Sequence, residues 1–339
     1  MDLTTHYLGF ELANPIMVGA CPLGSNLDTV RHLADCGAAA VVLPSLFEEE
    51  IMAAVRTELE QESAGAGFAE ATLGYHADPD GYHIGPQQYL KHLEALKGAV
   101  SIPVMASLNG TTGGGWTSYA KKMEGAGADA IELNVFYLPV DASESGEDVE
   151  RRTVDVVRSV KDAVSIPVAV KLSPFFSSIP NVARRLAEAG ADGLVVFNRF
   201  YQPDLDIEEL DVVPNLRLSS PDELRMRLRW LAVLSAQIEE LSLACTGGAH
   251  SAVDAIKALM VGADVAMVAS AVLRDGPGKI ADIEAEMRTW LEENEYSSVT
   301  QLRGSASQGS VEDPGTFERA QYIRTLHSWA APAQRTATA

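Results

Sequence analysis

The sequence predicts an α/β fold, a (β/α)8 barrel, on the basis of three observations. A helix end, the pair Gly-Ala and a short apolar run recur along the chain, and glycine suits the left-handed position that ends a helix. Apolar runs of a second kind lie between these units. Amphipathic helical patterns separate the runs. Buried strands that alternate with helices indicate a closed parallel sheet.

The recurrent unit supplies the second, fourth, sixth and eighth strands. It reads CGAAAVVLPS, AGADAIELN, AGADGLVVFN and VGADVAMVAS. The remaining strands come from NPIMVGA, SIPVMASLN, SIPVAVKLS and LSLACTGG, and a proline at the first position of a strand removes no hydrogen bond from the sheet. In chain order, strands are predicted at residues 15–19, 40–44, 103–108, 130–134, 167–172, 193–198, 242–246 and 265–269.

Helical patterns occupy the intervals between these strands. LDTVRHLADCG, TSYAKKMEGAG, VERRTVDVVRSVKDA, NVARRLAEAG and AVDAIKALMVG place apolar residues three and four positions apart. A doubly wound open sheet is the alternative arrangement. The barrel is preferred because the unit recurs to the end of the strand region and no G-x-G-x-x-G motif accompanies it.

Two connections are too long for simple crossovers between strands. They run over about 47–100 and about 199–237, and insertions after barrel strands usually lie over the C-terminal face that holds the active site. The predicted TIM barrel with these inserts spans residues 1–303. A helical extension is expected at 304–329, where FERAQYIRTLHSW is amphipathic, and a disordered tail at 330–339.

Composition and charge restrict the class of protein. A net charge of −21 repels phosphate backbones, so nucleic acid is not an expected partner. No apolar run approaches about 18 residues, so no membrane span is expected. The start MDLTTHYLGF lacks the basic and apolar regions of a signal peptide. The 3 cysteines are far apart, which argues against a metal motif and favours reduced thiols in a cytoplasmic protein.

The residues at the ends of the predicted strands are the candidate site residues, because barrel chemistry gathers at the carboxyl ends of strands. They contain no pair of carboxylates, which argues against glycoside hydrolysis. They also contain no cluster of histidine and acidic residues, so no metal is expected. In chain order they are Gly19, Ala20, Ser45, Ser107, Asn109, Asn134, Lys171, Asn198, Thr246, Gly247, Gly248, Ala269 and Ser270.

Lys171 is the most informative of these residues. It ends the otherwise apolar strand VAVKLS, and burial of an ammonium group without partners is costly. A side chain that reaches out to water is the plain alternative. Two chemistries fit a buried Lys171: a Schiff base with a carbonyl substrate, or stabilisation of the charge on a reduced flavin.

The segment TGGAHS, residues 246–251, indicates a phosphate site. Two glycines follow the seventh strand and a helix begins soon after, so backbone N–H groups can enclose a phosphate, beside Ala269 and Ser270. A tight turn without a ligand is the alternative. Asn134 and Asn198 end two further strands. Amides beside a lysine suit the edge of a flat heterocycle, although asparagine is also common in turns.

The segments together resemble the dihydroorotate dehydrogenase family, whose members are FMN-dependent (β/α)8 barrels. The resemblance runs over about residues 3–273 and rests on YLGFELANPIMVGACPLG, GADAIELN, IPVAVKLSP, GLVVFN and TGGAHSAVDAIKALMVGADVAMVASAVL. It implies FMN contacts by Gly19, Ala20, Ser45 and Lys171, the last at the pyrimidine edge. It places Asn134 against the isoalloxazine or the substrate and Asn198 in the cofactor site as well. It also implies phosphate contacts by Gly247, Gly248, Ala269 and Ser270, a substrate contact by Asn198, and a contact of Asn109 with flavin or substrate.

The segment NVFYLP departs from the family pattern. The family usually has N-L-S-C-P-N here, or serine in place of the cysteine, and that residue is the base that removes a substrate proton. In this chain Tyr137 stands at the position of the base, and Pro139 replaces a nearby amide. Pro44 stands where lysine is common. Arg199 replaces a small hydroxyl residue and is a candidate to bind a substrate carboxylate.

The predicted function is that of an FMN-dependent oxidoreductase that acts on a CH–CH bond of a small anionic substrate, with an unidentified electron acceptor. Tyr137 and Lys171 are the predicted catalytic residues, and His76, His83 and His250 are alternative proton carriers. A Schiff-base lyase or aldolase that uses Lys171 stays open, as does a flavin-binding partner protein without turnover. A homodimer is an expectation of the resemblance alone.

Overall fold

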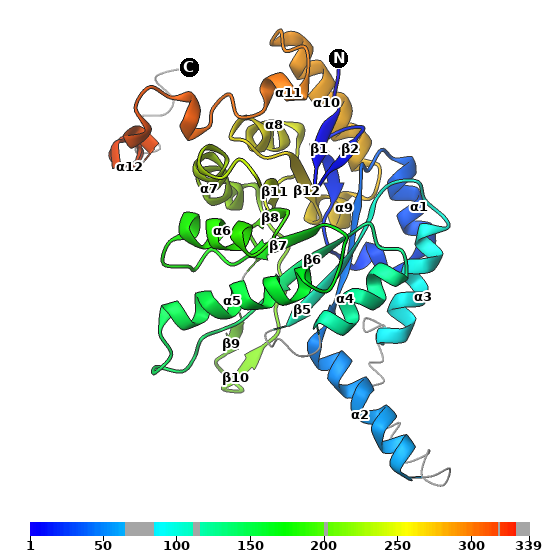
Figure 1. Cartoon of the computed structure of the whole chain (residues 1–339). Coiled ribbons are helices and arrows are strands. Elements are labelled where there is room, and N and C mark those ends of the chain that lie inside the picture. Colours follow the sequence, from blue (N-terminus) through cyan, green and yellow to red (C-terminus); the bar gives the residue numbers. More distant parts are fainter. Residues whose placement is uncertain (65–84, 111–115, 200–202, 318, 330–339) are drawn as a thin grey trace.

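A closed barrel of parallel strands forms the centre of the molecule (Figure 1). The computed structural model describes residues 1–64, 85–110, 116–199, 203–317 and 319–329. Around the barrel the order is β11-β12-β3-β4-β5-β6-β7-β8, which closes on itself, so the predicted fold is confirmed and the open sheet is excluded. The strands are β3 Ile16–Val18, β4 Val41–Phe47, β5 Val104–Gly110, β6 Ala130–Val135, β7 Val168–Leu172, β8 Gly193–Val196, β11 Ser242–Thr246 and β12 Val265–Val268.

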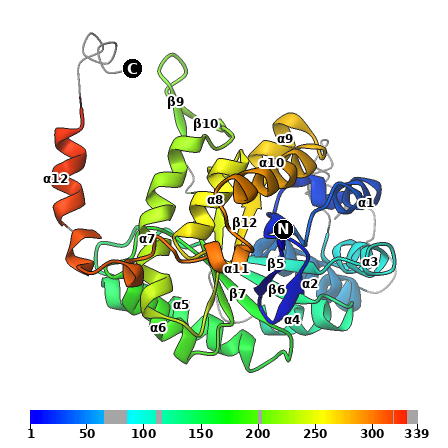
Figure 2. The same ribbon diagram turned by 90° about the horizontal axis from the view of Figure 1, so that it is seen from above.

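Helices pack around the outside of the barrel (Figure 2). The glycines that precede the recurrent strands, Gly37, Gly127, Gly190 and Gly262, have φ between +92° and +107°, so they take the left-handed conformation expected after a helix. The helices are α1 Leu27–Asp35, α3 Pro86–Lys97, α4 Trp116–Gly125, α5 Gly146–Lys161, α6 Ile179–Glu188, α7 Leu224–Gln237, α8 Ala252–Met260, α9 Ser270–Asp275 and α10 Lys279–Glu293.

Side chains alternate between two packed layers along each strand. In β6, Ile131 and Leu133 belong to the layer between strands and helices, whereas Ala130 belongs to the layer inside the barrel. The alternation therefore directs Glu132 and Asn134 into the barrel. The register places Asn134 opposite Asn109 of β5 and Lys171 of β7, so three polar side chains meet at one level near the carboxyl ends.

An antiparallel hairpin, β1 Thr5–Tyr7 and β2 Phe10–Leu12, closes the opposite end of the barrel. Tyr7, Leu8 and Leu12 pack into the apolar layer inside the barrel. The Leu8 N–H donates to Ser242 Oγ at 3.0 Å, at the first residue of β11. In Figure 2 this hairpin lies in front of the barrel strands. The amino end of the barrel is thus filled by apolar side chains.

Each of the two long connections contains one barrel helix and one additional element. In the first connection, α2 Glu48–Ala64 extends away from the barrel and α3 packs in the ring of helices (Figure 1). Its predicted proton carriers His76 and His83 lie outside the described ranges. In the second connection, the hairpin β9 Asp204–Asp206 and β10 Asp211–Val213 precedes α7. Both additional elements lie beyond the carboxyl ends of the strands.

The chain continues after the barrel through α11 Val299–Leu302, two short 3-10 turns and α12 Arg319–His327. One of these turns, Gln308–Ser310, packs against α7, where the Gln237 amide donates to Gln308 Oε1 at 3.1 Å. Helix α12 stands apart from the barrel in both views (Figures 1 and 2). The predicted disordered tail 330–339 lies outside the described ranges. Among the helices described, none has the length and apolar character needed to span a bilayer.

Candidate active site

Three adjoining cavities lie at the carboxyl ends of the barrel strands. The central chamber has a volume of about 420 Å³ and the small chamber about 150 Å³, and an outer chamber of about 690 Å³ lies under the β9–β10 hairpin. Asn198 and Arg199 line all three. The predicted residues in the central chamber are Ala20, Ser45, Asn109, Asn134, Lys171, Asn198, Arg199, Ala269 and Ser270.

Lys171 lies between the central and small chambers, with its side chain 12% exposed. Its ammonium group donates to Glu132 Oε1 at 3.2 Å, and the Glu132 side chain is fully buried. The buried ammonium group therefore has a carboxylate partner within the barrel. Sequence reasoning overlooked Glu132, although a carboxylate between Ile131 and Leu133 in an apolar strand was the available signal.

Amide and hydroxyl groups surround Lys171 at the floor of the central chamber. The Asn198 amide donates to Asn134 Oδ1 at 2.9 Å, which joins β6 to the end of β8. This bond uses one donor and one acceptor, and each amide has further hydrogen-bonding capacity for a ligand. The hydroxyls of Ser45 and Ser107 lie 2.8 Å apart on neighbouring strands. The floor can therefore bind the polar edge of a planar ligand.

The small chamber is enclosed by the glycine loop that follows β11. Gly247 and Gly248 have φ of +83° and +90°, and a Cβ on Gly248 would lie 2.5 Å from the Leu224 backbone nitrogen. Only glycine fits so close to α7 in this conformation. The hydroxyl of Ser270 from the loop after β12 also lines the chamber. Backbone N–H groups and hydroxyls of this kind suit a phosphate group.

Ser219, in the second long connection, also lines the small chamber and was missed by sequence reasoning. Its N–H donates to Ser270 Oγ at 2.9 Å, and its hydroxyl lies 3.1 Å from His250 Nε2. A serine in a long loop carries no distinctive signal. His250 lies behind the chamber, 5% exposed, and burial lowers the pKa of its ring. A neutral His250 that is held by Ser219 is poorly placed to carry a proton to the central chamber.

Two arginines stabilise the walls of the chambers through one carboxylate. Arg199 Nε lies 3.2 Å from Glu223 Oε2, and its guanidinium also donates to the Arg217 carbonyl. Arg227, a third residue that the sequence did not reveal, is 3% exposed and lies 3.8 Å from the same Glu223 carboxylate. It donates to the Thr246 and Glu223 carbonyls, each at 2.6 Å. Arg227 thus holds the glycine loop against α7.

Gly19 lies below the chambers rather than in their lining. Its N–H donates to the Val268 carbonyl at 3.1 Å, and an added Cβ would lie 3.4 Å from Met267 Cβ. A side chain at this position would thus make only ordinary contacts, and the neighbouring Ala20 lines both the central and small chambers. A direct FMN contact by Gly19 stays a prediction.

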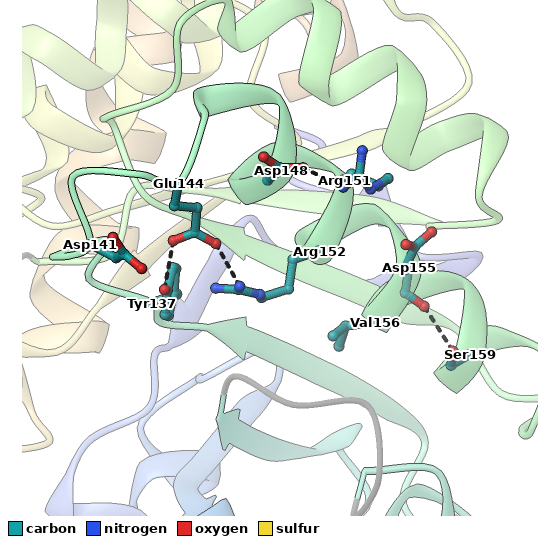
Figure 3. A pocket seen from close by; sticks show the side chains of 9 residues that line it. All are labelled: Tyr137, Asp141, Glu144, Asp148, Arg151, Arg152, Asp155, Val156 and Ser159. Carbon is teal, nitrogen blue, oxygen red and sulfur yellow. Dashed lines mark hydrogen bonds and ion pairs between the residues drawn. The ribbon is translucent and has the colours of Figure 1, made fainter.

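Tyr137, a predicted catalytic residue, also lies outside the chambers. It lies in a separate cavity of about 570 Å³ beside α5 (Figure 3). Its hydroxyl donates to Glu144 Oε2 at 2.7 Å, and the Arg152 guanidinium lies 4.0 Å from its ring centre. Phe136, one residue earlier, lines the outer chamber instead. The acid–base role of Tyr137 stays a prediction.

The barrel, with an amide-rich and cation-bearing cavity at its carboxyl end, places the chain among the α/β-barrel enzymes. The dihydroorotate dehydrogenase family model matches residues 80–291. The catalytic subunit of dihydroorotate dehydrogenase B (NAD(+)) from Thermoplasma volcanium is 28% identical over 90% of this chain and 98% of its own length. The corresponding subunit from Methanosarcina acetivorans is 29% identical over 87% of this chain and 93% of its own length.

A more distant relative is the chloroplastic dihydropyrimidine dehydrogenase (NADP(+)) of Arabidopsis thaliana, 22% identical over 91% of this chain and 77% of its own length. The family model covers more than half of the chain, and the relatives named above cover most of it. The chain therefore belongs to the dihydroorotate dehydrogenase family and is an oxidoreductase, as the resemblance predicted.

Proposed function

We propose that the chain is an FMN-dependent oxidoreductase that acts on a CH–CH bond of a small anionic substrate. The observation that carries this proposal is the placement of the Lys171 ammonium between a chamber walled by amides and a chamber closed by a glycine loop. The first chamber suits a planar ring and the second a phosphate. The size of the central chamber is also in the usual range for bound cofactors.

FMN, when bound, would supply the hydride acceptor that the side chains of the chain cannot supply. Lys171 would lie at the pyrimidine edge of the flavin, where its charge favours the reduced form. Asn134 and Asn198 would orient the ring through their amides. The phosphate would be held in the small chamber by Gly247, Gly248, Ala269 and Ser270.

The outer chamber is the proposed substrate side. It adjoins the central chamber through Asn109, Asn134 and Asn198, so amides can bind a ligand that stacks above the flavin. Arg199 and Arg217 line the same chamber and favour an anionic substrate. A substrate carboxylate that bound Arg199 would compete with Glu223 for the guanidinium.

The Schiff-base alternative is disfavoured by the ion pair of Lys171. The Lys171 nitrogen is bonded to Glu132 at 3.2 Å, so a substrate carbonyl would have to displace this contact before the nitrogen could act as a nucleophile. The alternative of a flavin-binding protein without turnover is compatible with the same geometry, and only a measurement of flavin reduction separates it from an enzyme.

Purification and anaerobic reduction test the proposed function. We expect the purified protein to be yellow and to release an equimolar amount of FMN on denaturation. We expect dihydroorotate or a related dihydropyrimidine to bleach the flavin absorbance, and added NAD+ or a dye to restore it. A protein that binds no FMN even with excess cofactor would contradict the proposal. Bound FMN that no CH–CH donor reduces would favour the protein without turnover.

Tyr137→Phe tests the acid–base role predicted from the sequence. Because the hydroxyl is bonded to Glu144 outside the chambers, we expect the rate of flavin reduction to fall by less than about tenfold, against the 10²–10⁴-fold that a general acid or base contributes. Stopped-flow absorbance measures the rate, with Tyr322→Phe on the exposed face of α12 as the matched control. A loss of about 100-fold or more would show that Tyr137 moves into the chambers during turnover.

A further inference from the structure

Glu132 is a buried carboxylate to which the proposed function gives no part. It lies in the middle of β6, is fully buried and faces the interior of the barrel. Its Oε1 accepts a hydrogen bond from Lys171 at 3.2 Å. Its Oε2 has no hydrogen-bond partner among the residues that the structure describes. A half-satisfied carboxylate at such a depth is costly, so its presence requires an explanation.

Tyr7 is the second unpartnered group in the same interior. It belongs to the hairpin at the amino end, and its hydroxyl is buried with no hydrogen-bond partner in the described ranges. Burial, and then the nearby negative charge of Glu132, raises the pKa of Tyr7 well above its usual value. Tyr7 therefore stays a neutral phenol, and Lys171 is the cation that balances Glu132.

The ion pair also determines where Lys171 can lie. Its long side chain extends from β7, the strand next to β6, and Glu132 binds the ammonium from the interior side. Asn134, one inward position further along β6, lies at the level of Lys171 and lines the central chamber. The ammonium is thus held between the carboxylate below and the chamber above. A ligand in the chamber is therefore exposed to the positive charge of the Lys171 ammonium, which the negative charge of the adjacent Glu132 carboxylate partly cancels.

We propose that Glu132 is the positioning residue for Lys171, and that its carboxylate both fixes the ammonium at the floor of the chambers and limits the positive charge that a bound flavin experiences. This inference rests on the proposed function. It predicts that removal of the negative charge shifts the bound flavin toward its reduced form, because a reduced flavin carries more negative charge than an oxidised one.

The reduction potential of the bound flavin tests this role without reliance on turnover. In Glu132→Gln the amide oxygen can still accept from Lys171 but the charge is gone. We expect the ratio of reduced to oxidised flavin at a fixed potential to rise about tenfold, which is about 30 mV for a two-electron couple. Glu132→Asp keeps the charge and withdraws it from Lys171. It should shift the ratio in the same direction by about threefold, or about 15 mV. Anaerobic equilibration with redox dyes measures both shifts.

Lys171→Met shows whether Glu132 acts through Lys171. If it does, Glu132→Gln should change the potential less in the Lys171→Met background than in the wild type, because no ammonium remains whose position Glu132 can fix. An equal shift in both backgrounds, or no shift in the wild type, would overturn the positioning role.

Two outcomes remain to be separated. If Glu132→Gln does not retain FMN, the Glu132→Asp potential decides, and an unchanged or lower value overturns the inference. A wild-type protein that binds no FMN overturns the proposed function together with this inference. A flavin-loaded wild type without the expected shift overturns only the role of Glu132.

Discussion

Replacement of Lys171 by methionine is expected to lower the free energy of unfolding of the flavin-free protein by about 3–5 kcal/mol. The reason is the state in which Glu132 is left. Its side chain is fully buried, and Lys171 at 3.2 Å is the cation paired with it. Methionine fills a similar volume but cannot balance the charge. Urea denaturation near neutral pH, followed by circular dichroism, measures the loss.

The double variant Lys171→Met/Glu132→Gln is the matched control for this prediction. It removes the carboxylate together with the ammonium, so at least half of the lost stability should return. A small loss in Lys171→Met alone would mean that the interior of the barrel accommodates Glu132 without a counter-ion.

Replacement of Gly248 by alanine is expected to destabilise the protein by about 2–4 kcal/mol and to abolish FMN binding. Gly248 has φ of +90°, which a residue with a Cβ rarely adopts. The added Cβ would lie 2.5 Å from the nitrogen of Leu224 and 2.9 Å from its Cα, and these backbone atoms at the start of α7 cannot move independently. The loop must therefore shift, and with it the wall of the small chamber.

Gly125→Ala provides the comparison, because Gly125 is the last residue of α4, is exposed, and has no atom within 4 Å of an added Cβ. Alanine is the better helix former, so this variant should be neutral or more stable by up to about 1 kcal/mol. Denaturation curves and the FMN content of both variants are the measurements. Equal behaviour of the two variants would show that the loop after β11 tolerates a side chain.

The barrel itself could be predicted from the sequence because a local sequence pattern marks each strand. A glycine such as Gly190 ends a helix, a fully apolar run follows, and the parallel register then aligns the strand ends. Asn134 and Lys171 were found for the same reason, since polar residues at the ends of apolar strands are conspicuous. This reasoning depends only on near neighbours in the sequence.

The parts of the site that sequence reasoning missed depend on contacts between distant segments or on side-chain direction. Ser219 reaches the small chamber from the second long connection, and Arg227 holds the glycine loop from α7. The inward direction of the Glu132 side chain becomes evident only when the alternation of inward and outward side chains along β6 is followed residue by residue. Tyr137 lies two residues beyond the end of β6, where strand alternation no longer determines which way a side chain points.

Among the residues that the structure describes, the hairpin β1–β2 closes the amino end of the barrel. Tyr7, Leu8 and Leu12 fill this end, so a ligand that approaches along the barrel axis reaches Lys171 from the carboxyl side. If FMN binds as proposed, the reductant and the oxidant would both reach the flavin from this side and would react in turn. The kinetic result would be a ping-pong pattern, with parallel lines in double-reciprocal plots, in which the first product leaves before the second reactant arrives.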